Sequence, residues 1–199
     1  MQQNLPWILG TLAALLHGTG YVLYNIQTKR GQSRPNIVSW SIWAFMAGLN
    51  AFSFAEISSL AHALQYMVGT FAATITFILS FWWGRFTWPS RKEIAVFFIC
   101  VVAVFIWWSQ KDAGLANLLG CTAFLISFQP TFMGVYRDPH KEKPLAWNVW
   151  SLAFAVNLTN NIVCWQGDAV SIINPALLLV CHWSIASLSR PGRKRGCAT

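Results

Sequence analysis

Residues 40–50 read Trp-Ser-Ile-Trp-Ala-Phe-Met-Ala-Gly-Leu-Asn, and residues 147–157 read Trp-Asn-Val-Trp-Ser-Leu-Ala-Phe-Ala-Val-Asn. The second stretch repeats the spacing of two tryptophans and one asparagine 107 positions later, and a proline, Pro35 or Pro144, precedes each copy. A pattern that returns at a fixed offset indicates an internal repeat. We therefore expect the chain to use one small structural unit twice.

The composition is that of a membrane protein. Of the 199 residues, 55% are hydrophobic and 10% are charged, with a mean hydropathy of +0.46, whereas roughly a quarter of the residues of a soluble domain are charged. The net charge is +8. In a membrane chain this excess favours contact with anionic lipid headgroups over binding to nucleic acid.

Seven apolar runs approach the length of about 20 residues that spans a bilayer. Backbone groups in hydrocarbon must bond within the protein, and the runs lack the alternation of barrel strands, so all seven are predicted to be helices. The predicted fold is an all-α membrane protein with helices over residues 7–26, 36–55, 60–83, 93–109, 115–133, 145–165 and 169–188.

The basic residues predict how these helices are oriented. Thirteen of the 14 Lys and Arg residues follow the first, third, fifth or seventh run, and Lys111 is the exception. Cytoplasmic loops are enriched in Lys and Arg. The amino terminus is therefore predicted to lie outside the membrane and the carboxyl terminus in the cytosol.

The repeat and the helix count together predict a three-one-three organisation. Residues 1–87 form the first triple-helix half, residues 88–113 a linker helix, and residues 114–199 the second half with a basic cytosolic tail. The linker adds one crossing, so the two halves run the same way through the membrane. Parallel repeats of this kind occur in transporters, where the substrate site lies between the repeats.

These features resemble the SWEET sugar transporters, the half-size SemiSWEETs and the wider PQ-loop group: seven spans, parallel triple-helix halves, a linking fourth helix, and prolines and tryptophans in matched positions. The Pro-Gln pair of that group is not present in order. Gln129-Pro130 is a reversed pair, and it aligns with Gly20-Tyr21 in the first half. By this resemblance Tyr21, Gln129 and Pro130 belong to an inner gate, where a helical proline permits a kink.

The repeated motif predicts a solute site. Trp43 and Asn50 are seven residues apart, hence two helical turns and on the same helix face, and Trp150 and Asn157 form the equivalent pair. A tryptophan ring can stack on the apolar face of a sugar, and an amide can bond to its hydroxyl groups. The two pairs therefore predict a shared pocket for a polar solute.

Further polar residues lie in the predicted spans. Related transporters place paired asparagines on the third helix of each half, and here the matching positions are Gln65 and Asn174, which join the predicted site by resemblance. His17 and His182 lie in the first and last spans. They could couple protons, or they could be neutral and bonded to backbone carbonyls.

Other interpretations of the repeated motif stay open. Trp40 and Trp147 fit a belt at the membrane interface, and Trp43 and Trp150 could simply pack. The two repeated asparagines could bond between helices and hold the halves together. These alternatives assign the motif to stability, whereas the pocket assigns it to solute binding.

The sequence favours a facilitative transporter for a small neutral or zwitterionic solute, such as a sugar, that works by alternating access. No acidic residue is expected mid-membrane, which favours passive movement. The alternatives are a receptor on the same scaffold and an accessory or assembly membrane protein.

The remaining expectations concern chemistry, partners and location. No catalytic or metal-binding pattern is present in the sequence, so we expect no enzyme activity and no cofactor. The expected partners are the solute, the lipid bilayer and a second copy in a homo-oligomer. The expected location is a bacterial plasma membrane.

Overall fold

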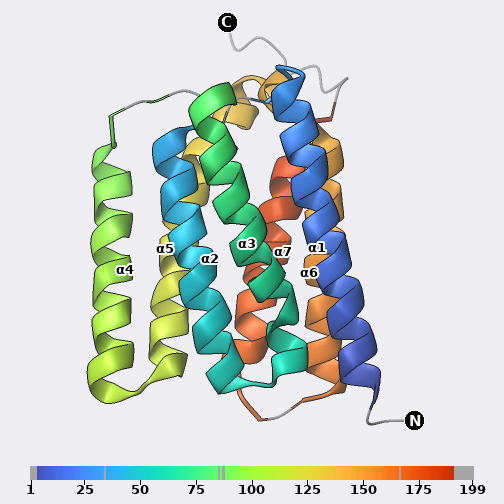
Figure 1. Ribbon diagram of the computed structural model, residues 1–199, viewed down its shortest axis with the longest axis vertical. Helices are drawn as coiled ribbons and strands as arrows, with labels where there is room; N and C mark the ends of the chain where they lie inside the picture. Colours follow the sequence, from blue (N-terminus) through green and yellow to red (C-terminus); the bar gives the residue numbers. More distant parts are fainter. Residues whose placement is uncertain (1–3, 34, 85, 87, 166, 191–199) are drawn as a thin grey trace, which may run out of the picture.

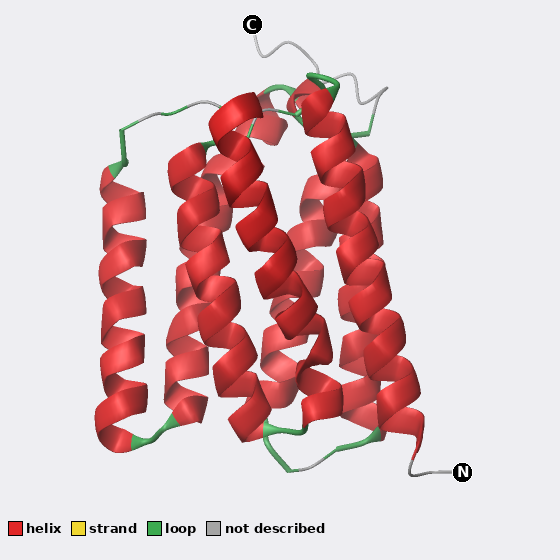
Figure 2. Ribbon diagram, in the orientation of Figure 1, coloured by secondary structure: helices red, strands yellow, loops and turns green. Residues whose placement is uncertain are grey.

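The computed structural model describes residues 4–33, 35–84, 86, 88–165 and 167–190. Across these residues the regular structure is helical, and the long helices run side by side (Figures 1 and 2). In chain order the elements are α1 (Leu5–Lys29), α2 (Ile37–Ile57), α3 (Leu60–Trp83), α4 (Arg91–Gln110), α5 (Ala113–Arg137), the short 3-10 helix η2 (Pro139–Lys141), α6 (Pro144–Val163) and α7 (Val170–Leu188).

The predicted helices are confirmed, with every end within four residues of its predicted position. Six of the seven long helices, all but α6, are long and apolar enough to cross a bilayer. Large apolar side chains cover the outside of the bundle; Leu15, Phe71 and Phe105 are each more than 60% exposed. An apolar exterior of this kind is compatible with a multi-pass membrane protein.

Helix α6 is less apolar than the other helices because it carries several asparagines. Three of them, Asn157, Asn160 and Asn161, are buried. They are enclosed because α6 packs closely against both α1 and α7. The amide groups of these residues therefore face protein, which explains how a helix of this composition lies within the bundle.

The helices pack in a ring with one helix outside it. Helix α3 packs against both α1 and α2, and α7 packs against both α5 and α6. The ring closes where α1 contacts α6 and where α2 contacts α5. Helix α4 packs on α5 and α2 from outside, at the left edge of Figure 1. The ring therefore brings α1, α2 and α3, which precede α4 in the chain, against α5, α6 and α7, which follow it, and these are here called the two sets of helices.

Local chemistry explains several of the helix ends. Proline occupies the first turn of α1 and of α6, where its missing N–H is not needed. Ser90 and Glu93 form a reciprocal capping box at the start of α4. The side chain of Asp112 accepts a hydrogen bond from the Leu115 amide at the start of α5. These contacts stabilise the places where the connections meet the bundle.

The described basic residues gather at one end of the bundle, which we call the basic end. They lie in or beside the last turns of α1, α5 and α7, the first turn of α4 and the α5–α6 connection, and they are Lys29, Arg30, Arg91, Lys92, Arg137, Lys141, Lys143 and Arg190. Lys111 lies at the opposite end. Arg34, Arg85 and the basic tail after Arg190 lie outside the described residues.

Candidate functional site

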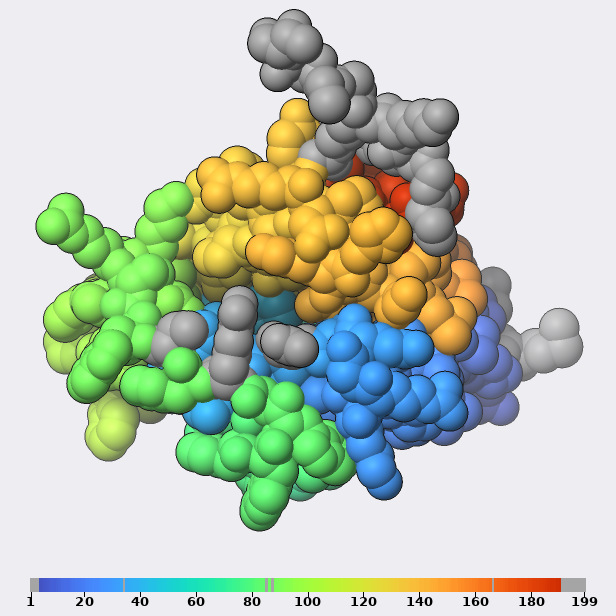
Figure 3. All heavy atoms as spheres, turned by 90° about the horizontal axis from the view of Figure 1, so that it is seen from above, coloured from blue at the N-terminus to red at the C-terminus, as the bar shows by residue number. Residues whose placement is uncertain are grey.

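A cavity of about 460 Å³, here called the vestibule, lies at the basic end. Figure 3 looks onto this end, where the yellow-orange α5–α6 connection and the blue α1–α2 connection lie on opposite sides of a hollow. Both connections, the last turns of α5 and the rings of Tyr24, Trp40, Trp43 and Trp147 line the vestibule. Its volume is within the range of small-molecule sites, about 300–1,000 Å³.

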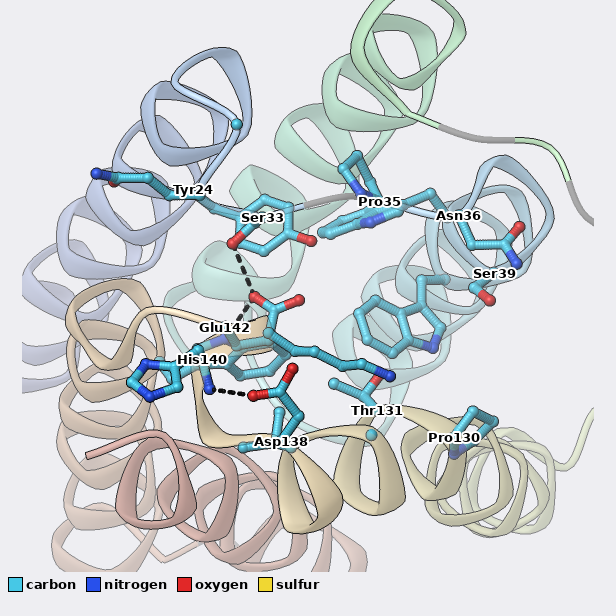
Figure 4. Close-up of a pocket in the computed structure, with 18 residues that line it drawn as sticks. Tyr24, Ser33, Pro35, Asn36, Ser39, Pro130, Thr131, Asp138, His140 and Glu142 are labelled. Carbon is cyan, nitrogen blue, oxygen red and sulfur yellow. Dashed lines mark hydrogen bonds between the residues drawn. The ribbon is translucent and has the colours of Figure 1, made fainter. Parts of the chain in front are cut away.

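The carboxylate of Glu142 projects into the vestibule (Figure 4). Its Oε2 atom accepts hydrogen bonds from Ser33 Oγ at 2.9 Å and from Trp147 Nε1 at 3.3 Å. The bond to Ser33 joins the α1–α2 connection to the α5–α6 connection. Burial raises the pKa of Glu142 to about 7, although the hydrogen bonds from Ser33 and Trp147 act in the opposite direction.

The raised pKa of Glu142 predicts a pH-dependent stability. The folded state binds this proton more tightly than the unfolded chain, so the stabilisation is complete below the unfolded pKa of 4.5 and is lost as the pH rises through about 7. Because solvent reaches the vestibule, the expected loss is about 2 kcal/mol. We expect Glu142→Gln to escape this loss, so that its melting temperature, relative to that of the wild type, rises between pH 5 and pH 8.

Thermal unfolding in detergent across that pH range measures the difference. The matched control is Glu56→Gln, which removes an exposed carboxylate at the other end of the bundle. A melting-temperature difference between Glu142→Gln and the wild type that stays constant from pH 5 to pH 8 would contradict the prediction.

A smaller cavity of about 50 Å³, here called the central cavity, lies deeper in the bundle. It shares Trp40, Trp43 and Trp147 with the vestibule, so these three rings lie between the two spaces. Asn50 also lines it, and at about 1.5 Å per residue Asn50 lies roughly 20 Å along α2 from the basic end. The central cavity is therefore near the middle of the bundle.

Aromatic rings around the two cavities form contacting pairs that occur twice. Each ring of one pair has a counterpart 107 residues later in the matching pair. Trp40 and Trp43 have ring centroids 5.1 Å apart, and so do Trp147 and Trp150. The centroid distance from Trp40 to Tyr21 is 6.1 Å, and that from Trp147 to Phe128 is 6.2 Å. Two separate parts of the chain thus present nearly the same spacing of rings.

A third matched pair joins the two sets of helices. Trp43 of α2 lies 5.2 Å from Phe128 of α5, and Trp150 of α6 lies 4.9 Å from Tyr21 of α1. Gly20 makes room for Trp150, because a β-carbon at position 20 would lie 2.5 Å from the indole ring. The first pair is stacked at 25° and the second is edge-to-face at 69°. In this third pair the distance repeats, whereas the ring orientation does not.

His17 and His182 both line the central cavity. His17 Nδ1 is 3.0 Å from Gln65 Nε2. His182 Nδ1 is 2.7 Å from the carbonyl oxygen of Leu178, the arrangement expected for a histidine bonded to a backbone carbonyl. One nitrogen of each imidazole ring is therefore held by protein.

A network of buried side chains, here called the asparagine cluster, lies beyond the central cavity. Asn174 Nδ2 donates to Asn50 Oδ1 at 2.8 Å and to Asn117 Oδ1 at 2.7 Å. Asn117 Nδ2 donates to Asn50 Oδ1 at 2.6 Å, and the Tyr66 hydroxyl donates to Asn174 Oδ1 at 3.0 Å. The four residues come from α2, α3, α5 and α7. They tie both sets of helices together away from the vestibule.

The structure brings several predicted site residues together. Trp43, Asn50, Trp150 and Tyr21 all line the central cavity. Pro130, inside α5, lines the vestibule. Residues predicted for the pocket and for the inner gate therefore border two neighbouring cavities between the two sets of helices.

Other predicted residues lie away from the cavity lining. Asn174 belongs to the asparagine cluster, and Gln65 is fully buried against His17. Gln129 is exposed on α5 and accepts a hydrogen bond from Lys92. In this conformation Asn174 and Gln65 link helices, and Gln129 faces outward.

Asn157 also lies outside the cavity lining, unlike its repeat partner Asn50. It is fully buried in α6, where its backbone carbonyl and its side-chain oxygen accept hydrogen bonds from Asn161. The predicted equivalence of the two asparagines thus extends to their spacing from a tryptophan but not to their surroundings.

The sequence around Glu142 gives little sign of its place in the vestibule. Lys141 and Lys143 flank it, a pattern typical of a solvated loop, and its burial depends on the neighbouring α1–α2 connection. The one available signal is that Glu142 aligns with Ser33 when the halves are matched on their prolines. The structure adds that these two aligned residues are hydrogen-bonded to each other.

Among the described residues, no three His, Cys, Asp or Glu side chains come together as a metal site would require. No family model, curated protein or solved structure matches the chain. Function is therefore inferred from the geometry of the two cavities.

Proposed function

We propose that the chain is a facilitative membrane transporter for a small neutral or zwitterionic polar solute. The observation that carries this proposal is the pair of cavities between the two sets of helices, separated by Trp40, Trp43 and Trp147. Transporters built from repeats place their substrate site between the repeats. In the proposal, the basic end is cytosolic and the membrane is a bacterial plasma membrane.

The helix packing supports a three-one-three repeat of the SWEET type. If α1, α2 and α3 are exchanged with α5, α6 and α7, every major contact within the ring maps onto another contact: α1 with α6 becomes α5 with α2, and α3 between α1 and α2 becomes α7 between α5 and α6. The matched ring distances support the same exchange. Helix α4 then has the role of the linker.

Alternating access follows from this arrangement as a proposal. The vestibule lies on the side of the central cavity toward the basic end, with Trp40, Trp43 and Trp147 between the two, whereas the asparagine cluster closes the opposite end. In one state of the proposed cycle these rings would part and open the central cavity to the vestibule. In the other state the cluster would separate while the rings stay in contact. The indole N–H of Trp43 is buried without an acceptor among the described residues, and an oxygen atom of a solute could satisfy it.

Osmotic swelling of proteoliposomes tests the transport of many candidate solutes. Light scattering is recorded after mixing with iso-osmotic sugars, polyols, amino acids and betaines. We expect at least one solute to enter faster than into protein-free liposomes, with a rate that saturates. Trp43→Ala is expected to reduce that rate about tenfold or more, because it removes a ring that borders both cavities.

The matched control is Trp108→Ala, because Trp108 is 77% exposed on α4. It should leave the rate unchanged. Because Trp43→Ala also removes ring contacts with Trp40 and Phe128, the rates are compared at a temperature at which both variants are folded. If no solute in the panel enters faster than into protein-free liposomes, or if Trp43→Ala transports as fast as the wild type, the transporter proposal fails. A receptor or accessory membrane protein then becomes the better interpretation.

A further inference from the structure

The vestibule contains a carboxylate that is held by neutral groups. Glu142 Oε2 accepts from the hydroxyl of Ser33 and from the indole N–H of Trp147, and neither donor carries a charge. Its other oxygen, Oε1, receives no hydrogen bond from the described residues. Figure 4 shows the carboxylate pointing into the middle of the cavity. A partly buried carboxylate held in this way is costly, so a positive charge brought by a ligand would be favourable here.

Aromatic rings surround this carboxylate. Tyr24, Trp40, Trp43 and Trp147 line the same cavity, and the centroids of Tyr24 and Trp40 are 5.2 Å apart. Ring faces attract organic cations, and Trp attracts them most strongly. A carboxylate combined with several Trp and Tyr rings is therefore suited to a positive charge that is spread over an alkylated nitrogen.

We infer that the vestibule binds an organic ammonium group, with Glu142 as its counter-ion and Trp40 and Trp147 as its aromatic walls. The role of the bound molecule as a transported solute rests on the proposed function, whereas its binding does not. A zwitterion of zero net charge that carries an ammonium group fits the binding site inferred here and also the class of solute proposed for transport.

Other ligands fit the vestibule less well. A hard cation such as Ca²⁺ takes six to eight oxygen ligands, usually including several carboxylates, and among the described residues no three His, Cys, Asp or Glu side chains are placed to hold a metal ion. A neutral sugar would leave the carboxylate charge uncompensated. An ammonium group needs one carboxylate and apolar or aromatic surroundings, and the vestibule provides both.

The titratable groups that face the vestibule set the expected selectivity. Besides Glu142, they are Asp138, His140, Lys141 and the phenol of Tyr24. Asp138 Oδ1 accepts from the backbone amide of His140, so part of its hydrogen-bonding capacity is used. Lys141 brings a positive charge to the same cavity and would repel an ammonium ligand. Replacement of Glu142 and replacement of Lys141 should therefore change the affinity in opposite directions.

Isosteric probes test the inference on the full chain in an uncharged maltoside detergent. Choline and 3,3-dimethylbutan-1-ol have nearly the same shape, but only choline is charged. Binding is followed at pH 8 by intrinsic tryptophan fluorescence and by isothermal titration calorimetry. We expect choline to bind at least about tenfold more tightly than the neutral alcohol, and Glu142→Gln to abolish that preference. Lys141→Met is expected to strengthen choline binding about threefold.

Acidification should weaken choline binding, because the pKa of Glu142 is raised to about 7 and its proton replaces the negative charge. Between pH 8 and pH 6 the ionised fraction falls about tenfold, and the affinity should fall by the same factor. His140 also faces the vestibule, so the pH series is repeated in His140→Gln as a control. The choline affinity of Glu142→Gln should not show this tenfold fall between pH 8 and pH 6.

Equal affinity for choline and for the neutral alcohol would overturn the inference, and so would a correctly folded Glu142→Gln protein that keeps the preference for choline. Folding of each variant is checked by its melting temperature and its gel-filtration profile. If Glu142→Gln does not fold, Lys141→Met provides the test: tighter binding of choline without tighter binding of the neutral alcohol supports the site, and unchanged choline affinity overturns it.

Flux and lipid composition separate the ammonium site from the proposed function and identify the source of the ammonium. Choline binding without flux of any solute supports the ammonium site and contradicts transport. Flux of a neutral solute without any preference for choline over the neutral alcohol supports transport and contradicts the ammonium site. If choline binding is lost in nanodiscs of phosphatidylethanolamine but kept in those of phosphatidylglycerol, the site is supported and its ammonium comes from a lipid headgroup. If it is kept in both, the ligand is a free solute.

Discussion

Gly10→Ala is expected to destabilise the protein by about 3 kcal/mol, although it adds a single methyl group. A β-carbon at position 10 would lie 2.0 Å from the backbone carbonyl oxygen of Ala61, and a backbone atom cannot turn away as a flexible side chain can. The clash is relieved only if α1 and the start of α3 move apart. Small residues permit such close approach of membrane helices.

The matched control for Gly10→Ala is Gly120→Ala on α5. Nothing lies within 4 Å of a β-carbon at position 120. Alanine favours a helix over glycine by about 1 kcal/mol, so this control should be neutral or slightly stabilising. Melting temperatures of the two purified variants measure the contrast. If Gly10→Ala melts at or above the wild-type temperature, the close contact between α1 and α3 is absent in solution.

Asn174→Leu is expected to reduce the free energy of unfolding by about 3 kcal/mol, because it removes the centre of the asparagine cluster. Asn174 is fully buried and bonds to Asn50, Asn117 and Tyr66. A leucine at this position would leave a hydroxyl and two amides without one partner each, at about 1 kcal/mol for each group. For a chain of this size, the loss corresponds to a fall in melting temperature of roughly 10 °C.

Thr74→Val is the control for this substitution. The Thr74 hydroxyl is exposed on α3 and bonds to the carbonyl oxygen of Thr70 in its own helix, so little stability should depend on it. Because Asn174 links helices from both sets, Asn174→Leu should also make the protein easier to cleave by proteases at low temperature. Wild-type stability in Asn174→Leu would show that the cluster contributes little to folding.

The helices of this protein could be predicted from its sequence because each is encoded locally. A run of apolar residues, with charges at its ends, gives the same answer whatever its neighbours are. Even the interruption by Pro130 inside α5 is consistent with a helix, and α5 continues beyond it. Which helices contact one another depends on side chains far apart in the sequence, and no single stretch specifies them.

The candidate site was predictable only in part, for the same reason. The spacing of Trp43 and Asn50 places both on one helix face, and both line the central cavity. The same spacing for Trp150 and Asn157 does not reveal that the side chain of Asn161, one turn further on, donates a hydrogen bond to the side-chain oxygen of Asn157. Periodicity gives the direction of a side chain, whereas its partners come from the rest of the fold.

The buried amides of α6 have a consequence for how the chain enters a membrane. A segment that carries three buried asparagines gains less free energy from entering lipid alone than its apolar neighbours do. Asn160 donates to the carbonyl oxygen of Pro6 at the other end of the sequence, a partner made long before α6 itself is synthesised. Biogenesis of this protein should therefore have an order. Helix α1 inserts into the bilayer first, and α6 becomes stably inserted only when it packs against α1.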